Sequence, residues 1–312
     1  MNFISHFQGQ PFATNKVESY SRGKSLSLLL LAPALALLAI VFVWPLLRYG
    51  WLSFHADSVI TGLVAIPNGG ANWIRLLSDG RFWQDALQTL RFAGVSVGLE
   101  LVLGLALALA LHQRGPGRGV LRVLCLLPWA LPTTVMALGW RWIFNDPHGP
   151  INALLLQLGL PSQGFLSTPS TTWLVSVLAD VWKTTPFVAL LLLAGLQSIP
   201  TDLEEAMRLE GASPWQRLRR LTLPLLIPYL GLCCLFRVAQ AMGVFDLIQV
   251  LTDGGPAGST ESLALYAYLN AMRFLDFGYS ASVMLGMFLL LLVLSALVLV
   301  VQRRFQQQQE LT

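Results

Sequence analysis

The chain has 312 residues and a net charge of +4; 55% of its residues are hydrophobic and only 12% are charged. Soluble domains carry about 25% charged residues, so this chain lacks the polar surface that a water-soluble core requires. The composition excludes a soluble enzyme, a nucleic-acid-binding protein and a disordered scaffold, and it predicts an all-α polytopic membrane protein in contact with lipid.

The first predicted element is a polar segment, residues 1–25, which precedes an apolar run at 26–47. Because no short cleavable pattern precedes this run, we interpret it as an uncleaved membrane anchor and not as a signal peptide. The sequence RGKS at 22–25 imitates the end of a phosphate-binding loop. The first glycine of that motif would stand at position 18, which is Glu18, so we expect no ATP site on this chain.

Six apolar runs are long enough to span a membrane, since a spanning helix needs about 20 residues. The predicted spans are 26–47, 86–111, 120–141, 172–196, 222–245 and 279–301. The third and fifth are interrupted by prolines, namely Pro128, Pro132, Pro224 and Pro228. Membrane helices tolerate proline where neighbouring groups satisfy the freed backbone atoms. Residues 26–301 are therefore expected to form one transmembrane domain, followed by a cytoplasmic tail at 302–312.

The distribution of lysine and arginine orients these spans, because cytoplasmic loops carry an excess of both. One set of ends and loops holds Lys16, Arg22, Lys24, Arg114, Arg118, Arg122, Arg208, Arg217, Arg219, Arg220, Arg303 and Arg304. The opposite set holds only Arg48, Arg75, Arg81 and Arg273. We therefore expect both termini in the cytoplasm.

The loop at about 197–224 lies on the positive side and is predicted to form two short helices with a sharp turn between them. Thr201 and Glu204 have the spacing of a capping box, so the first helix should begin there and end at Gly211. Ser213 and Pro214 then begin the second helix, with proline at its first position. Read without further context, such a basic loop anchors to lipid headgroups.

The run EAMRLEGASPWQRLRRLTLP at 205–224 resembles the EAA loop of ABC-importer permeases, with a Glu-Ala-Ala start, a later glycine and an apolar-x-Leu-Pro end. Met207 stands where the family has alanine, and Glu210 where it has aspartate. The resemblance implies that this loop is a coupling helix that docks on a cytoplasmic ATPase. The residues to which it gives this role are Glu204, Glu205, Ala206, Met207, Glu210 and Gly211.

The resemblance covers about residues 26–301. It includes DVWKTTPFVALLLLAGLQSIP at 180–200 and FDLIQVLTDGGPAGSTESLALYAY at 245–268, which are similar to the sugar branch of these permeases, the MalF/UgpA-like subunits. It implies the type I ABC-importer fold and a multi-pass location in the bacterial cytoplasmic (inner) membrane. The implied partners are a second, MalG-like permease chain, two ATP-binding-cassette ATPase subunits and an extracytoplasmic solute-binding protein. ATP and Mg would be used by the ATPase, so this chain is expected to be a transport subunit, not an enzyme, and to bind no cofactor itself.

Polar side chains inside spans are costly and usually functional or paired. This chain has Glu100, Asp180, Lys183, Arg237 and Gln240. Asp180 and Lys183 are three residues apart, as are Arg237 and Gln240, so each pair shares a helix face. The arginine fork suits hydroxyl or carboxylate groups of a ligand. Two structural alternatives stay open: Asp180 pairs with Lys183 inside the bundle, or Arg237 pairs with an acid of a partner subunit. Glu100 is expected to be structural.

Alignment with the family's motifs extends this set, since ligand contacts there come from three helices. The substrate-binding residues that the resemblance implies are Trp129, Thr133, Asp180, Lys183, Thr184, Phe187, Arg237, Gln240, Ala241 and Val244. The glycines Gly94 and Gly98 form a GxxxG pattern that predicts helix packing. The three cysteines give no disulfide framework, and the four histidines have no metal-site spacing.

Together these observations favour the permease subunit of an ATP-driven, binding-protein-dependent importer of a sugar or related osmolyte, working by alternating access. An α-glucoside such as trehalose, sucrose or glucosylglycerol is the favoured substrate. One alternative is a permease for glycerol phosphate or an oligosaccharide. Another is an ion-coupled secondary transporter with Glu100 and Asp180 as relay groups, which would predict inverted repeats that the sequence does not display. A membrane enzyme would need a cluster of catalytic or metal-binding residues on one side, and the sequence shows no such cluster.

Overall fold

A computed structural model describes residues 30–113, 115 and 117–310 of the chain. The predicted segment 1–25, the start of the first span and Arg114 lie outside the described residues. The chain divides after Trp51 into two compact units.

The described part of the first unit, from Leu30, is one apolar helix that ends at Leu52, the first residue of the second unit; its mean hydropathy is 2.5. It contains a π-helical turn, η1 (Ala39–Val43), in which the amide of Trp44 bonds to the carbonyl of Ala39, and it continues as α2 (Trp44–Leu52). The wider turn comes directly before Pro45, whose nitrogen has no hydrogen to donate. The helix is long enough to be the first membrane span.

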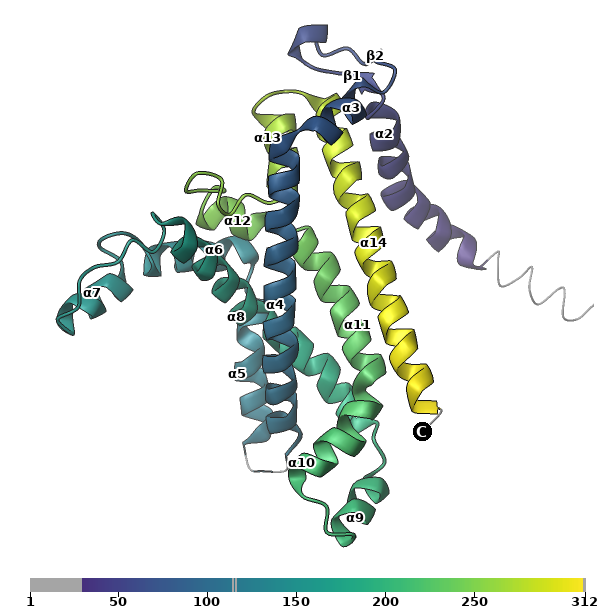
Figure 1. Ribbon diagram of the computed structural model, residues 1–312, viewed down its shortest axis with the longest axis vertical. Helices are drawn as coiled ribbons and strands as arrows, with labels where there is room; N and C mark the ends of the chain where they lie inside the picture. Colours follow the sequence, from purple (N-terminus) through teal and green to yellow (C-terminus); the bar gives the residue numbers. More distant parts are fainter. Residues whose placement is uncertain (1–29, 114, 116, 311–312) are drawn as a thin grey trace, which may run out of the picture. The chain divides into compact units, whose positions relative to one another are not determined.

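The second unit is almost entirely helical and is coloured from blue to yellow in Figure 1. It begins with β1 (His55–Ala56), η2 (Val59–Thr61) and β2 (Ile66–Pro67), of which β1 and β2 form a short antiparallel pair. Its helices are α3 (Ala71–Ser78), α4 (Gly80–His112), α5 (Arg118–Ala130), α6 (Thr133–Ile143), α7 (Pro150–Gln157), α8 (Pro169–Gln197), α9 (Thr201–Leu209), α10 (Pro214–Arg217), η3 (Leu218–Thr222), α11 (Leu223–Met242), α12 (Asp246–Leu251), α13 (Leu263–Met272) and α14 (Phe277–Glu310).

Within the described residues, five helices are long and apolar enough to cross a membrane, and one bent pair can supply a sixth crossing. The five are Leu30–Leu52, Gly80–His112, Pro169–Gln197, Pro214–Met242 and Phe277–Gln307. Each predicted span therefore has a helical counterpart, and the helical polytopic fold is confirmed.

The predicted third span is not one straight helix. The bent pair consists of α5 and α6, which meet at an angle of 89°. Pro132 cannot donate a hydrogen bond, and its ring disfavours the helical conformation at Leu131, which is extended with ψ 138°. The chain therefore leaves the helix at Leu131 and turns sharply before α6 begins.

The predicted fifth span, in contrast, stays continuous although it also contains two prolines. The π-helical turn η3 joins α10 to α11, with the amide of Leu223 bonded to the carbonyl of Leu218. Pro224 comes one residue later, and the wider turn accommodates a residue that has no amide hydrogen to donate. Wider turns thus precede proline both here and in the first unit.

Helices α4 and α8 approach each other closely because a glycine lies between them. A Cβ atom on Gly104 would lie 2.6 Å from Cγ1 of Val188, which is too close for any real contact. Around Gly94 and Gly98, by contrast, the described residues of this unit place no atom within 4 Å of where a Cβ would be. Packing at the GxxxG pattern therefore stays a prediction, whereas Gly104 makes a close contact between α4 and α8.

A cluster of hydroxyl and carboxylate groups ties α13 and α14 to the start of α4. Asp79, the N-cap of α4, accepts hydrogen bonds from the hydroxyl groups of Tyr266 (2.5 Å) and Tyr279. The guanidinium of Arg75 lies 3.7 Å from the ring centroid of Tyr279, and Arg81 pairs with Glu261 at 2.9 Å. We call Asp79, Tyr266 and Tyr279 the tyrosine–aspartate cluster.

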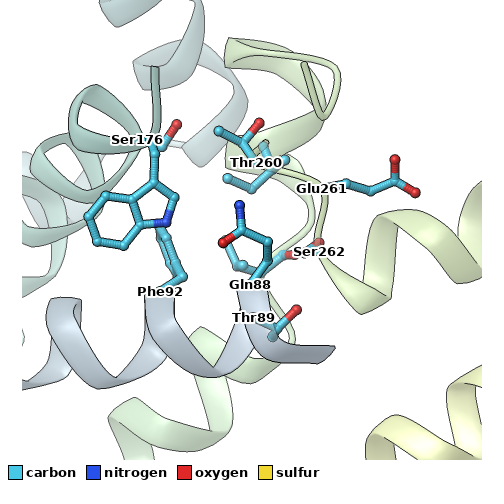
Figure 2. Close-up of a pocket in the computed structure, with 10 residues that line it drawn as sticks. Gln88, Thr89, Phe92, Ser176, Thr260, Glu261 and Ser262 are labelled. Atoms are coloured by element: carbon cyan, nitrogen blue, oxygen red, sulfur yellow. Dashed lines mark hydrogen bonds between the residues drawn. The ribbon is translucent and has the colours of Figure 1, made fainter. Parts of the chain in front are cut away.

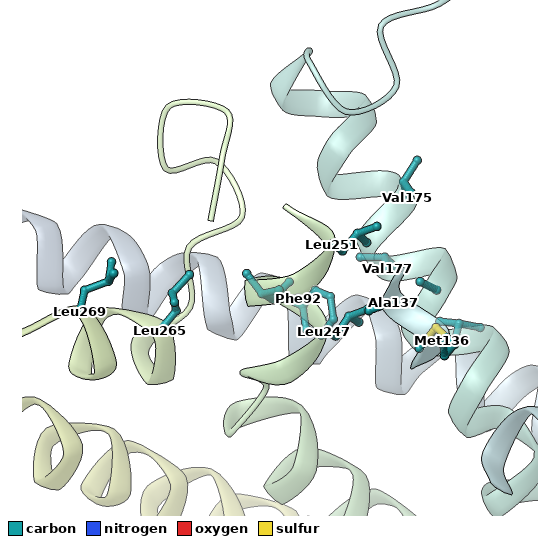
Figure 3. Close-up of a cluster of buried hydrophobic side chains, with 12 residues drawn as sticks. Phe92, Met136, Ala137, Val175, Val177, Leu247, Leu251, Leu265 and Leu269 are labelled. Carbon is teal, nitrogen blue, oxygen red and sulfur yellow. The ribbon is translucent and has the colours of Figure 1, made fainter. Parts of the chain in front are cut away.

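The largest apolar core cluster joins α4, α6, α8, α12 and α13 (Figure 3). Phe92 of α4 lies near Leu247 of α12, and Met136 and Ala137 of α6 pack in the same cluster. One face of α6, the second half of the bent pair, is therefore packed against α12, whereas Val135, Leu138 and Trp142 of the same helix are exposed.

Candidate functional site

Two buried polar stripes face each other between α4 and α8. Along α8, small polar or acidic side chains recur at every fourth position, which is one face of a helix. They are Thr172, Ser176, Asp180 and Thr184, all buried. The buried face of α4 carries Asp85, Thr89, Ser96 and Glu100. Such small residues allow helices to approach closely in a membrane, and their hydroxyl groups bond back to carbonyls, as Ser176 does to Thr172 (2.8 Å).

Arg237 of α11 joins both stripes and is the centre of the site. Its Nε and Nη2 atoms donate to the two carboxylate oxygens of Glu100, the Nη2···Oε1 distance being 2.8 Å. Nη2 also donates to Oδ2 of Asp180 (3.0 Å), and Nη1 donates to Oε1 of Gln240 (2.6 Å). Arg237 is only 2% exposed and Glu100 is fully buried. We call Glu100, Asp180 and Arg237 the charged triad.

The triad matches neither of the two structural alternatives for the charged residues. Asp180 pairs with Arg237 and not with Lys183, so the predicted pair of Asp180 and Lys183 is wrong. Arg237 in turn pairs with acids of its own chain. Asp180 pairs with a residue of another helix and not with its neighbour three residues along α8. The reason is that a buried arginine needs acidic acceptors for the several donors of its planar guanidinium.

Lys183 instead braces the break between α5 and α6. Its ammonium group donates to the carbonyl oxygens of Leu131 (2.8 Å) and Trp129 (3.5 Å). Where a helix ends, its last carbonyls lack intrahelical partners and carry the negative end of the helix dipole. A lysine from α8 therefore supplies the donor and the charge that the end of α5 requires.

Aromatic side chains surround this break. The rings of Trp129 and Phe187 are stacked, with centroids 5.8 Å apart and planes 22° from parallel. Phe187 also makes an edge contact with Phe236 of α11, at 6.3 Å. Trp129, Phe236 and Gln240 are exposed on this chain. The site thus presents aromatic faces and one amide group, with the charged triad buried beneath them.

The structure brings together seven of the ten predicted substrate-binding residues. They are Trp129, Asp180, Lys183, Thr184, Phe187, Arg237 and Gln240. Thr184 donates to Glu100 (2.7 Å), and Thr133 begins α6 just after the break. Ala241 and Val244 pack into apolar clusters instead. Glu100, which is expected to be structural, pairs with Arg237 at this site, and its spacing on the polar face of α4 is the sequence signal that places it there.

A small pocket lies nearer the N-terminal end of α4 than Glu100 does, and Figure 2 shows the residues that line it. It is lined by Gln88, Thr89 and Phe92 of α4, by Ser176 of α8, and by the Thr260–Ser262 stretch. Gln88 donates to the carbonyl of Ser259, and Thr89 accepts from the amide of Leu263 (3.0 Å). These bonds fasten the loop before α13 to α4. Among the residues that the structure describes, no group of three His, Cys, Asp or Glu side chains is placed to hold a metal ion.

The predicted two-helix loop is present as α9 and α10. Gly211 has φ +78° and lies directly after α9, and Ser213 caps α10 with Gln216 in a capping box. The predicted capping box at Thr201 is wrong. Pro200 is the N-cap of α9 and makes no side-chain cap, and Glu204 pairs with Arg208 (2.7 Å) instead. Proline at the N-cap leaves Thr201 inside the helix, where its hydroxyl cannot play that role.

The loop exposes apolar side chains that no other described residue of the chain covers. Leu209 is 90% exposed and Trp215 is 67% exposed. Of the residues assigned to ATPase coupling, Glu205, Ala206, Glu210 and Gly211 are exposed, and Glu204 and Met207 are half-buried. Most of the predicted coupling residues are therefore accessible to another protein.

Comparisons with known proteins agree with this arrangement. A family model described as the binding-protein-dependent transport system inner membrane component matches residues 100–309. The chain is 41% identical to the trehalose/maltose transport system permease protein MalF of Thermococcus litoralis, over 90% of this chain and 95% of that protein. It is 36% identical to the sulfoquinovosyl glycerol transport system permease protein SmoG of Agrobacterium fabrum, over 88% of this chain and 89% of that protein.

Its fold is also that of a solved structure, a bacterial ABC transporter involved in the import of the acidic polysaccharide alginate. The two share 20% sequence identity with a TM-score of 0.79, over 93% of this chain and 99% of the other. At this identity the likeness concerns the fold alone. The spans, the two-helix loop and the relatives lead to one conclusion: the chain belongs to the family of binding-protein-dependent transport system inner membrane components and is a multi-pass inner-membrane permease subunit of an ABC importer, not an enzyme.

Proposed function

We propose that this permease subunit imports a sugar or related osmolyte, with an α-glucoside such as trehalose, sucrose or glucosylglycerol as its substrate. The observation that carries the proposal is the 41% identity to a permease named for trehalose and maltose, which extends over nearly all of that protein. A second relative is named for a glycosylated glycerol. Both names point to glycosides as the class of ligand.

The site around the α5–α6 break supports a carbohydrate ligand. The stacked rings of Trp129 and Phe187 offer an apolar face of the kind that packs against the C–H face of a sugar ring. Gln240, one turn from Phe236 on α11, offers both donor and acceptor atoms for hydroxyl groups. Glu100 and Asp180 are bonded to Arg237, which makes them poor candidates for the relay groups of an ion-coupled transporter.

In the proposed assembly this chain pairs with a second, MalG-like permease chain, and the cytoplasmic side binds two ATPase subunits that use ATP and Mg. A solute-binding protein delivers the ligand from outside, and both termini lie in the cytoplasm. Transport is by alternating access, in which ATP binding shifts the population from an inward-open to an outward-open state.

The α9–α10 loop is proposed to be the surface that docks on the ATPase. Exposed apolar groups in a cytoplasmic loop, here Leu209 and Trp215, are typical of a protein–protein contact. The acidic residues Glu205 and Glu210 are placed to pair with basic groups of the ATPase. The left-handed conformation of Gly211 keeps the turn between the two helices tight.

The proposal is tested by the ATPase activity of the purified complex in lipid. Binding protein is added with trehalose, sucrose, glucosylglycerol, maltose or glycerol phosphate in turn, at equal ligand saturation. Stimulation by an α-glucoside alone is the expected result. Stimulation by glycerol phosphate, or by none of the five with an intact complex, contradicts the proposed substrate.

A further inference from the structure

The charged groups of the site cancel each other. The charged triad holds two carboxylates and one guanidinium, and Lys183 adds one positive charge nearby. The formal charges therefore sum to zero. Because the guanidinium is 2% exposed and the carboxylate of Glu100 is fully buried, these charges act on one another at low dielectric and not on bulk water.

Four of the five N–H donors of Arg237 are also occupied. Nε and Nη2 bond to the two acids, and Nη1 bonds to the side-chain oxygen of Gln240. The group that reaches the exposed face of α11 is thus the neutral amide of Gln240, and not the guanidinium. A ligand at this face meets aromatic rings and an amide, with no uncompensated positive charge within the triad.

We propose that Glu100 and Asp180 determine charge selectivity: by neutralising Arg237 they make the site accept an uncharged polyhydroxylated ligand and reject the acidic analogue of the same sugar. The inference rests on the proposed function, since it concerns the ligand of the same site. Removing either acid leaves one positive charge in excess beneath the binding face. An acidic sugar is then attracted, whereas a neutral one is nearly indifferent.

The size of the effect follows from Coulomb's law. A unit charge several Å from the ligand, at the effective dielectric of about 20 that describes protein sites, changes the binding constant of a monovalent anion by at least about tenfold. The neutral wild-type site offers an anion no net positive charge in return for its lost hydration, so the wild-type complex should bind the neutral sugar more tightly than its acidic analogue. In Asp180→Asn or Glu100→Gln this preference should fall by at least about tenfold.

The experiment measures equilibrium binding to the assembled complex in lipid nanodiscs, without the binding protein, whose own selectivity would otherwise mask that of the permease. The probes are trehalose and trehalose with one glucose unit oxidised to glucuronate. The ratio of the two dissociation constants is the readout, since it does not depend on how much of a variant assembles. Asp85→Asn is the matched control, because it removes a buried acid from the same helix that makes no bond to Arg237.

A reduced ratio in Asp180→Asn and Glu100→Gln, with an unchanged ratio in Asp85→Asn, supports the inference. Equal affinity of the wild-type complex for both sugars overturns it, and this measurement needs no variant to fold. If trehalose binds and Gln240→Ala weakens it, but the acid variants leave the ratio unchanged, only the charge inference fails. If the wild-type complex binds neither sugar, the proposed function fails and the inference with it.

Discussion

At the scale of single residues, Arg237 is a charged side chain that is almost completely buried. A buried guanidinium is tolerated only where its donors find acceptors and its charge finds counter-charges. Glu100, Asp180 and Gln240 supply both, from three helices. The three helices α4, α8 and α11 are thereby joined at one point inside the membrane-spanning part of the protein.

Replacing Arg237 alone should destabilise the protein more than replacing the whole triad. Arg237→Met leaves two buried carboxylates without a counter-charge, at a cost of about 3–5 kcal/mol. The triple variant that also carries Glu100→Gln and Asp180→Asn removes all three charges and should recover most of that loss. Thermal unfolding of the purified subunit, followed by the fluorescence of its ten tryptophans, checks this. Equal losses in the two variants would show that the triad charges do not depend on one another.

The tyrosine–aspartate cluster predicts a dependence of stability on pH. Burial raises the pKa of Asp79, but the hydrogen bonds from Tyr266 and Tyr279 outweigh it, so the pKa lies below its usual value of 3.8. A carboxylate with a lowered pKa stabilises the fold above its unfolded pKa, and this stabilisation is lost as the pH falls through the folded pKa. The melting temperature of wild type should therefore exceed that of Asp79→Asn at pH 7, and the gap should narrow below pH 4. A gap that stays constant down to pH 3 would contradict the ionic role of Asp79.

At the scale of elements, the behaviour of proline separates what the sequence predicts from what it does not. Both the third and fifth spans contain prolines, yet only α5–α6 breaks. In α11, Pro224 falls in the first turn and a π-helical turn precedes it. At the break, Pro132 follows an extended Leu131, and Lys183 from a distant part of the chain stabilises the freed carbonyls. The sequence shows the position of Pro132, but it does not show that Lys183 bonds to the carbonyl of Leu131 at the break.

The close contact of α4 and α8 is a second property of whole elements that can be tested. Gly104→Val should destabilise the isolated subunit by about 1–3 kcal/mol, because the added atoms overlap Val188 and the helices must move apart. Gly98→Val, on the same helix but with no neighbouring atom within 4 Å, is the matched control and should have little effect. Both variants are compared by thermal unfolding in detergent. A larger loss in Gly98→Val than in Gly104→Val would contradict the packing described for α4.

At the scale of the whole molecule, hydrophobic runs predict the helices and the loop motif predicts the family, because both depend on neighbours in sequence. The pairing of charges depends on neighbours in space. Arg237 and Glu100, for example, are 137 residues apart in the sequence. Spacing along one helix favours Lys183 as the partner of Asp180 because the sequence does not show which residues of other helices lie nearby. The spacing of polar residues along α4 and α8 does indicate part of this pairing, since two polar helix faces inside one membrane bundle are expected to contact each other.

Coupling between the permease and its ATPase should depend on the backbone of the α9–α10 turn. Gly211 has φ +78°, a conformation that asparagine tolerates and a β-branched residue does not. Gly211→Val should therefore abolish ligand-stimulated ATPase activity of the assembled complex, while Gly211→Asn should retain most of it. Insertion of both variants into membranes is measured as the control. Normal stimulation in Gly211→Val would contradict the proposed docking role of this loop.

The length of α5 sets the depth in the membrane at which the chain bends. The 13 residues of α5 extend about 20 Å at 1.5 Å per residue, whereas the hydrocarbon core of a bilayer is about 30 Å thick. Beyond Leu131 the chain turns by 89°, and non-helical backbone at that depth must face protein or a water-filled space. With Arg118 on the cytoplasmic side, the length of α5 therefore places the bend about two thirds of the way across the hydrocarbon core from that side. There the carbonyl of Leu131 accepts a hydrogen bond from Lys183, so protein satisfies the backbone at that depth.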